Sequence, residues 1–232
     1  MFSKFNLYLC NQMEPLTIYC IPGMGVNERL FKNLKLNNCI IKHIKWLEPT
    51  KNESLPHYAM RLSVQIDTSK PFCLIGVSFG GMCATEISKQ LNPVKTFLVS
   101  SSKTRAEVPA KIKLWNKIPL YKLLNDKHYI NGALLLKKQF GVINKEQSAR
   151  FLEMLQTAPN NYFKGAVHCI VNWKNKEYPS TIVHIHGNAD QVLPHHKINA
   201  DYTIDNGSHF MIINRADEIN SIINEELKFY FQ

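Results

Sequence analysis

The sequence predicts an α/β protein with a mostly parallel central sheet of about six strands, flanked by helices. Short apolar runs rich in β-branched residues alternate along the chain with segments whose apolar residues recur at helical spacing. The 232 residues are 45% hydrophobic, which is enough to bury one sizeable core. The alternation is interrupted over residues 103–178. We therefore expect a helical cap at 103–178, inserted between the fourth and fifth strands of a core formed by residues 1–102 and 179–232.

Each expected strand is a short apolar or β-branched run followed by turn-forming residues. The strands are expected near residues 16–21, 39–46, 72–77, 94–100, 180–186 and 199–204. Upstream of them, Phe5, Leu7 and Leu9 recur at every second position. This short pattern fits an extra edge strand or a loose tail, and we favour an ordered segment.

The expected helices of the core follow the strands in alternation. They lie near residues 28–35, 55–67, 80–91 and 214–230. The last helix carries the clearest signals, because Asn214 can cap its first turn and the isoleucines that follow recur at helical spacing.

Inside the expected cap, groups of leucine and aromatic residues at helical spacing are separated by residues that favour turns. These residues are Pro109, Pro119, Asn131-Gly132, Gly141 and Pro159. A further helix near 160–173 is expected to lead the chain back into the sheet.

Composition narrows the class of protein. No stretch approaches the ~20 consecutive apolar residues of a membrane span, and the first residues lack the apolar core and cleavage site of a secretory signal. Among the six cysteines, Cys20, Cys39 and Cys73 fall inside expected strands, and no C-x-x-C occurs. Reduced, buried thiols explain these positions well. We expect a cytoplasmic protein without a membrane span.

The positive charge is concentrated in one part of the chain. Residues 103–150 contain eleven Lys and Arg against three Asp and Glu, a net charge of +8, while the whole chain carries +10. One interpretation is a solvated cap surface that keeps the protein in solution. The other is attraction of an anionic partner, such as an acidic carrier protein or an acyl chain with a carboxylate. Nucleic acid is disfavoured, because no recognised binding motif accompanies the charge.

The most informative motif is Gly76-Val77-Ser78-Phe79-Gly80. It follows an apolar run and precedes a helical pattern, so Ser78 stands at the apex of a sharp strand-to-helix turn, as in a nucleophile elbow. The two glycines are needed where a Cβ would collide with the neighbouring strand or helix. The turn lifts the serine hydroxyl out of the sheet, and the free N–H groups of the new helix point to the same place.

A serine nucleophile needs a base, and the base needs an acid that orients it. Asp190 follows the strand expected near 180–186, and His209 follows the strand expected near 199–204. Because the carboxyl ends of parallel strands meet at one edge of the sheet, Ser78, Asp190 and His209 can converge there.

On these residues the chain resembles the α/β-hydrolase family. Four elements carry the resemblance in order: Ile18 to Gly25, Gly76 to Gly80, His186 to Asp190, and Gly207 to Phe210. It covers roughly residues 15–232. The chain departs from the family at Pro22-Gly23, where the family often has His-Gly, and in having six expected strands where eight are typical.

The resemblance implies a serine hydrolase in which Ser78, His209 and Asp190 are catalytic. It further implies that the backbone N–H groups of Met24 and Phe79 stabilise the oxyanion, without a metal or organic cofactor. The expected substrate is a small acyl ester or thioester, as for a carboxylesterase or thioesterase. An alternative is an esterase for substrates linked to acyl carrier protein, of the pimeloyl methyl ester type. A second alternative is a protein of the same fold that binds a ligand without turnover.

Other candidate motifs have simpler explanations. His184 and His186 share one strand face and could form a metal pair, but hydrogen bonding within a buried strand is the favoured interpretation. His195-His196 is expected to be exposed in a loop, or to line the entrance of the site. The glycine turn at Gly23-Met24-Gly25 lacks the lysine and serine or threonine of a phosphate-binding loop.

Overall fold

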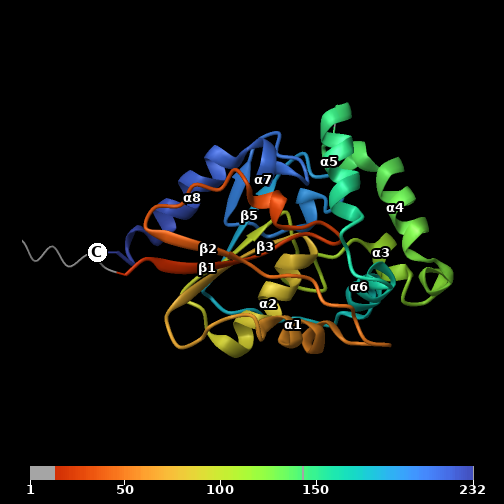
Figure 1. Cartoon of the computed structure of the whole chain (residues 1–232), viewed down its shortest axis with the longest axis horizontal. Coiled ribbons are helices and arrows are strands. Elements are labelled where there is room, and N and C mark those ends of the chain that lie inside the picture. The colour runs from red at the N-terminus through yellow and green to blue at the C-terminus, as the bar shows by residue number, and fades with distance from the viewer. Residues whose placement is uncertain (1–13, 143, 232) are drawn as a thin grey trace, which may run out of the picture.

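The computed structural model describes residues 14–142 and 144–231, and a six-stranded sheet forms their centre (Figure 1). The spatial order of the strands is β2-β1-β3-β4-β5-β6, and all neighbouring pairs are parallel. The predicted α/β class with a parallel sheet is therefore confirmed. The strands are β1 (Leu16–Ile21), β2 (Cys39–His43), β3 (Phe72–Val77), β4 (Thr96–Val99), β5 (Ile182–Gly187) and β6 (Tyr202–Ile204). The expected segment around Phe5 to Leu9 lies outside the described residues.

The central strands are buried on both faces, which explains why they are continuous apolar runs rather than alternating patterns. All residues of β3, β4 and β5 are buried, whereas the edge strand β2 contains no buried residue. The register aligns Ile21 of β1 with Gly76 of β3, and Val77 of β3 with Val99 of β4. The carboxyl ends of three neighbouring strands therefore meet at one edge.

Helices cover both faces of the sheet (Figure 1). The helices α1 (Leu55–Ser63) and α2 (Phe79–Leu91) lie on one side, and α7 (Met211–Asn214) and α8 (Ala216–Lys228) lie on the other. Ser54 caps α1 by accepting a hydrogen bond from the His57 N–H.

Two helix predictions need correction. The helix expected over 28–35 is a short 3-10 turn, η1 (Glu28–Phe31). The helix expected over 214–230 is confirmed as α8, but it begins only after Arg215, whose backbone departs from helical geometry at φ −126° and ψ 32°. Asn214 therefore ends α7 and does not cap α8.

Between β4 and β5 the chain forms a series of helices, as expected for an inserted cap. They are α3 (Ala110–Leu114), η2 (Leu120–Leu123), α4 (Asp126–Leu135), η3 (Lys137–Phe140), α5 (Lys145–Leu155) and α6 (Tyr162–Asn172). Asn125 and Asn144 form capping boxes at the starts of α4 and α5. The turn expected at Asn131-Gly132 is wrong, because both residues lie inside α4. A Cβ at Gly132 would face open space beyond its own helix, so no close packing there requires a glycine.

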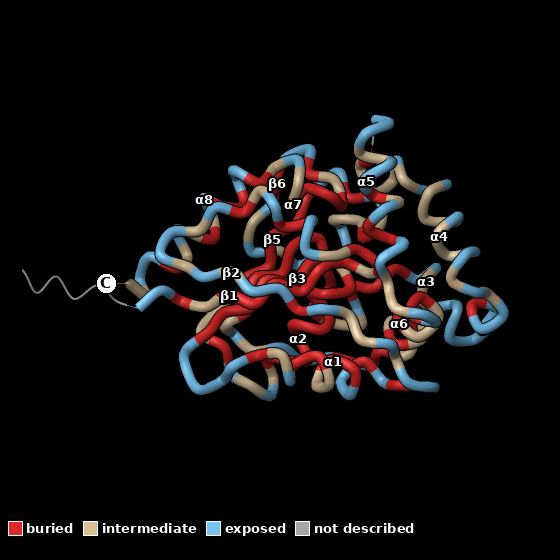
Figure 2. Tube along the Cα trace, viewed as in Figure 1, coloured by how far each residue is buried: buried red, intermediate tan, exposed pale blue. Residues whose placement is uncertain are grey.

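The cap is attached to the core unevenly. Helix α6 buries Tyr162, Phe163 and Ala166, whereas α3 and α4 contain no buried residue, as Figure 2 shows by their pale and tan colouring. The domain limits expected at 103 and 178 remain a prediction.

Two expectations from composition can be compared with the described residues. Within 14–142 and 144–231, no helix is long and apolar enough to cross a membrane. The five described cysteines are free, and Cys20, Cys73, Cys83 and Cys169 are buried, as expected for reduced thiols.

Candidate active site

Ser78 occupies the turn between β3 and α2. Its backbone has φ 53° and ψ −120°, a region that residues other than glycine rarely adopt. The turn is held by the end of β4 and the residues after it, because the Ser78 N–H donates to the Val99 carbonyl at 3.1 Å and the Ser101 hydroxyl donates to the Ser78 carbonyl at 2.7 Å. The neighbouring strand β4 thus fixes the strained serine at the edge of the sheet.

The glycines beside Ser78 allow the backbones of β1, β3 and α2 to meet. A Cβ on Gly76 would lie 2.5 Å from the Cα of Gly81, and a Cβ on Gly80 would overlap the carbonyl oxygens of Ile21 and Pro22. Each atom met is backbone and cannot rotate away. The collision predicted from the glycine spacing is therefore confirmed.

The structure brings Ser78, His209 and Asp190 together. His209 lies between β6 and α7, and its Nε2 atom is 2.9 Å from Ser78 Oγ. Its Nδ1 atom is 2.7 Å from Asp190 Oδ2. Asp190 follows the end of β5, and both it and His209 are buried, at 4% and 3% exposure. The three side chains form a continuous hydrogen-bonded line with the hydroxyl at its outer end.

Asp190 is held as a charged carboxylate. Its Oδ1 atom accepts hydrogen bonds from the N–H groups of Val192 and Leu193, both at 2.8 Å. Burial acts to raise the pKa of Asp190, but the charge and hydrogen bond of His209 together with the backbone N–H groups outweigh it. The net effect lowers the pKa below its usual value.

Known protein structures resemble this chain over more than nine-tenths of its length. An esterase from Thermogutta terrifontis superposes with a TM-score of 0.66 at 12% identity, covering 94% of this chain and 91% of its own. A bromoperoxidase from Bacillus anthracis gives 0.68 at 13% identity, covering 92% of each chain. A lipase-esterase related protein from Clostridium acetobutylicum gives 0.62 at 19%, covering 93% of this chain and 96% of its own.

The chain has the α/β-hydrolase fold. No protein-family model and no curated protein matches the sequence. At these low identities the likeness establishes the fold, and the interpretation of individual residues depends on the geometry of this chain itself.

The two residues expected to supply oxyanion donors belong to segments that border Ser78. Phe79 is the first residue of α2, where a backbone N–H has no acceptor within the helix. Met24 lies in the turn after β1, and a Cβ on the neighbouring Gly23 would be 3.7 Å from the Cβ of Ser78. The turn therefore borders the serine, and the donor role of both N–H groups remains a prediction.

His186 takes part in the acid loop, which the sequence did not indicate. Its Nε2–H donates to the Leu193 carbonyl at 2.8 Å, and the same nitrogen is 3.5 Å from Asp190 Oδ2. The only hint in the sequence was that His186 lies near the end of the strand whose following loop contains Asp190. His186 closes the loop that carries the acid.

The interpretation of the histidine pair needs correction at His184. Its ring stands 5.5 Å from that of His186, and among the described residues only the Ser101 backbone lies near one of its nitrogens, in a geometry too poor for a regular hydrogen bond. Burial lowers the pKa of His184 well below its ordinary value, so the ring is neutral. Over the described part of the chain no group of His, Cys, Asp and Glu side chains is arranged to hold a metal ion.

The remaining loop histidines differ from each other. His195 is half-buried, and its Nε2 atom lies 3.0 Å from the Thr203 hydroxyl. His196 is exposed, as expected.

The cap reaches the imidazole through Phe140. The Phe140 ring lies 5.7 Å from that of His209 in an edge-on arrangement, and the Phe140 carbonyl accepts a hydrogen bond from the Phe210 N–H at 2.9 Å. Nothing in the sequence distinguished Phe140 from the other apolar residues of the cap. One end of the cap is therefore fixed to the loop that carries His209.

Proposed function

We propose that the protein is a serine hydrolase that cleaves the carboxylic ester or thioester bond of a small acyl substrate. The observation that carries the proposal is the line from Ser78 Oγ to His209 Nε2 at 2.9 Å and from His209 Nδ1 to Asp190 Oδ2 at 2.7 Å. A serine hydroxyl is a weak nucleophile alone and becomes effective when an oriented base removes its proton.

The proposed reaction has two steps. In the first, Ser78 Oγ attacks the acyl carbonyl while His209 Nε2 accepts its proton, and His209 then protonates the leaving group. In the second, His209 activates a water molecule that releases the acyl group from Ser78 as a carboxylic acid. Asp190 holds the imidazole tautomer and stabilises its charged form. The N–H groups of Met24 and Phe79 receive the oxyanion in both steps.

The structural likeness is compatible with hydrolysis but does not distinguish it from other reactions of the same fold. Esterases are among the similar structures, but so is a bromoperoxidase, and one fold can host several chemistries. The choice therefore depends on the Ser-His-Asp arrangement in this chain. A ligand-binding protein without turnover would not need a serine in a strained turn beside a buried imidazole that is hydrogen-bonded to a carboxylate.

A fluorophosphonate probe tests the proposal, because it forms a covalent bond with an activated serine. We expect labelling of the wild-type chain at Ser78 and none of the Ser78→Ala variant. A panel of p-nitrophenyl esters and acyl thioesters of increasing chain length then identifies the preferred substrate. Absence of labelling and of turnover across the panel would instead favour the ligand-binding alternative.

A second candidate, favoured by the charge of the cap, is an esterase for acyl groups carried by an acidic protein. Among the described residues of 103–150, Arg150 is the only Lys or Arg that forms an ion pair with a carboxylate. Lys103 is buried and Arg105 and Lys113 donate to backbone carbonyls, but the exposed lysines of this segment are available to an anionic partner. They are Lys111, Lys117, Lys122, Lys127, Lys138 and Lys145. Hydrolysis of one methyl ester, compared when free and when attached to acyl carrier protein, distinguishes this candidate.

A further inference from the structure

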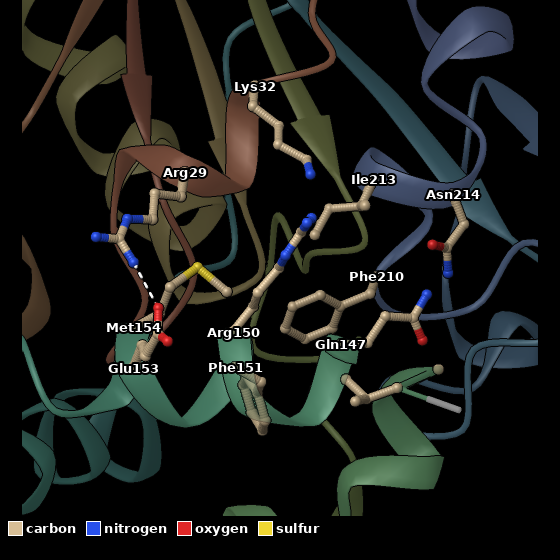
Figure 3. A pocket seen from close by; sticks show the side chains of 12 residues that line it. Arg29, Lys32, Gln147, Arg150, Phe151, Glu153, Met154, Phe210, Ile213 and Asn214 are labelled. Carbon is tan, nitrogen blue, oxygen red and sulfur yellow. Dashed lines mark hydrogen bonds and ion pairs between the residues drawn. The ribbon is translucent and has the colours of Figure 1, made fainter. Parts of the chain in front are cut away.

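A cavity of about 320 Å³ lies where the cap meets the core, close to the loop of His209 (Figure 3). It is bounded by η1, α5, α7 and the turn at Gly141. Ser78 and His209 do not line it. A ligand in this cavity would therefore lie beside the proposed catalytic site and not on the nucleophile.

Positive charge surrounds the cavity and is only partly neutralised. Its lining contains Arg29, Lys32 and Arg150 but one carboxylate, Glu153, which pairs with Arg29 at 3.0 Å. Arg150 pairs with Glu146 of its own helix, which does not line the cavity. Lys32 forms no ion pair with any residue that the structure describes.

Lys32 and Arg150 face each other. Figure 3 shows the side chains of Lys32, just after η1, and Arg150, from α5, directed toward one another across the cavity. Only Arg150 of these two has a carboxylate partner, Glu146, so the pair keeps a net positive charge that an anion between them would offset. A guanidinium and an ammonium together suit a carboxylate or phosphate group, which can accept several charge-assisted hydrogen bonds.

The floor of the cavity is apolar. Phe151, Met154 and Phe210 line it and are buried, at 3%, 4% and 9% exposure, and Ile213 lies at its side. The rings of Phe151 and Phe210 meet edge to face at 5.3 Å. An inorganic anion would leave this surface without a partner, and a neutral apolar molecule would leave the cations without one.

Because Lys32 and Arg150 supply positive charge and Phe151 and Phe210 supply an apolar surface in the same cavity, we infer that it is a binding site for an amphiphilic anion. The ligand has one carboxylate or phosphate held between Lys32 and Arg150 and a short apolar chain lying on Phe151 and Phe210. The volume is at the lower end of the range for ligand sites, which suits a small molecule. The inference concerns binding alone and does not depend on hydrolysis. If the proposed function holds, the acid that it releases belongs to this ligand class.

Calorimetric titration of the full chain tests the inference with four probes. Octanoate and octyl phosphate carry both features, octan-1-ol carries the chain alone, and acetate carries the charge alone. We expect each of the first two to bind at least tenfold more tightly than octanol or acetate. If both octyl anions bind, the site accepts either a carboxylate or a phosphate. If only one binds, its head group is the one that the site recognises.

Substitutions locate the binding. Lys32→Gln and Arg150→Gln should each weaken octanoate binding about five- to tenfold, since each removes one charge-assisted contact. Lys51→Gln, on an exposed lysine of the core, is the matched control and should change nothing. Ile213→Gln makes the wall polar and should weaken octanoate while leaving acetate unchanged. Thermal unfolding of each variant confirms that it is folded.

Binding at the Ser78 site is distinguished by repeating the titration with the Ser78→Ala variant and with fluorophosphonate-labelled protein. Unchanged octanoate affinity in both, together with loss in Lys32→Gln, supports a separate site. Loss on labelling without any effect of Lys32→Gln or Arg150→Gln would place the ligand at Ser78 and overturn the inference. Equal affinity for octanoate and octanol, or no binding of either anion, would overturn it as well. If the probe does not label Ser78, that result counts against the proposed function. The titrations of Lys32→Gln and Arg150→Gln still test the separate binding site.

Discussion

The Oδ2 atom of Asp190 lies 2.7 Å from Nδ1 of His209, and its other oxygen is engaged by two backbone N–H groups. A carboxylate can only accept hydrogen bonds, so Nδ1 of His209 must carry the proton. The lone pair of Nε2 then faces Ser78 Oγ. Asp190 thus determines which imidazole nitrogen is available to act as a base.

Exchange of Asp190 for Asn should reverse this tautomer. In Asp190→Asn, the amide oxygen can keep the bonds from Val192 and Leu193, which turns the NH₂ group toward His209. Nδ1 would then accept, and Nε2 would carry the proton and could not take another from Ser78. We expect kcat for ester hydrolysis to fall about 10⁴-fold, as in the Ser-His-Asp template, with a smaller change in KM.

The control for this prediction is Asp205→Asn, an exposed aspartate after β6 that is outside the proposed site. It should retain activity. A loss below tenfold in Asp190→Asn would show that another group orients His209.

Loss of the nucleophile or of the base should have nearly the same effect. Ser78→Ala removes the attacking oxygen and His209→Ala removes the group that activates it, so either change disables acyl transfer. Residues that act as a unit are strongly non-additive. The double variant should therefore be hardly slower than either single variant in steady-state hydrolysis. Multiplicative losses, or substantial turnover by Ser78→Ala, would contradict the mechanism.

Much of this arrangement follows from local patterns in the sequence. The buried strands are apolar runs, the elbow needs glycine where backbones touch at Gly76 and Gly80, and Asp190 and His209 follow strands that end at the same edge. Each signal lies within a few residues of the chain, and the parallel topology then places them together.

Features that depend on distant contacts were not predictable in the same way. The pattern of Ile219 and Ile223 lies wholly after Arg215, so it predicted α8 and gave no sign of the short helix α7 before it. A turn was expected at Gly132 because glycine favours turns, and the neighbouring sequence does not show that the chain around it is helical. The contact of Phe140 with His209 joins the cap to a loop of the core, and nothing in either segment alone indicates it.

The oxyanion donors can be tested through the backbone. Met24→Pro removes the N–H of the turn beside Ser78, whereas Met24→Ala keeps it while shortening the side chain. Removal of one such donor typically lowers kcat about 10²–10³-fold. We expect this loss in Met24→Pro alone, measured with a short p-nitrophenyl ester. Circular dichroism must show that the proline variant is folded. Equal activity of the two variants would exclude the Met24 N–H as a donor.

The buried cysteines should be unreactive in the folded protein. Burial raises the pKa of Cys73 to about 12, and it also raises the pKa of Cys20 and Cys83. A thiolate is the reactive form, so these side chains remain protonated and sheltered at neutral pH. Mass-spectrometric mapping after iodoacetamide treatment should find them unmodified in native protein and modified after unfolding in urea. Rapid native alkylation of Cys73 would show that the sheet opens locally.

The charge of the cap gives a prediction about substrate preference. Lys111, Lys117 and Lys138 are exposed and form no ion pair with a described carboxylate. We expect their joint exchange for Gln to lower kcat/KM about three- to tenfold for an ester that carries a carboxylate, because steering acts mainly on the rate of encounter. Hydrolysis of a neutral ester of the same length should be unchanged.

The matched control exchanges three exposed lysines of the core, Lys35, Lys51 and Lys197, and so removes the same net charge from elsewhere. If steering is local to the cap, this variant should keep most of the preference for the charged ester. The difference between the variants should also vanish in high salt, because the screening length falls from ~8 Å at physiological ionic strength to ~3 Å at 1 M. Equal losses in both triple variants would indicate a general effect of net charge. No loss in either, with no salt dependence in the parent protein, would leave the cap lysines as a solvated surface.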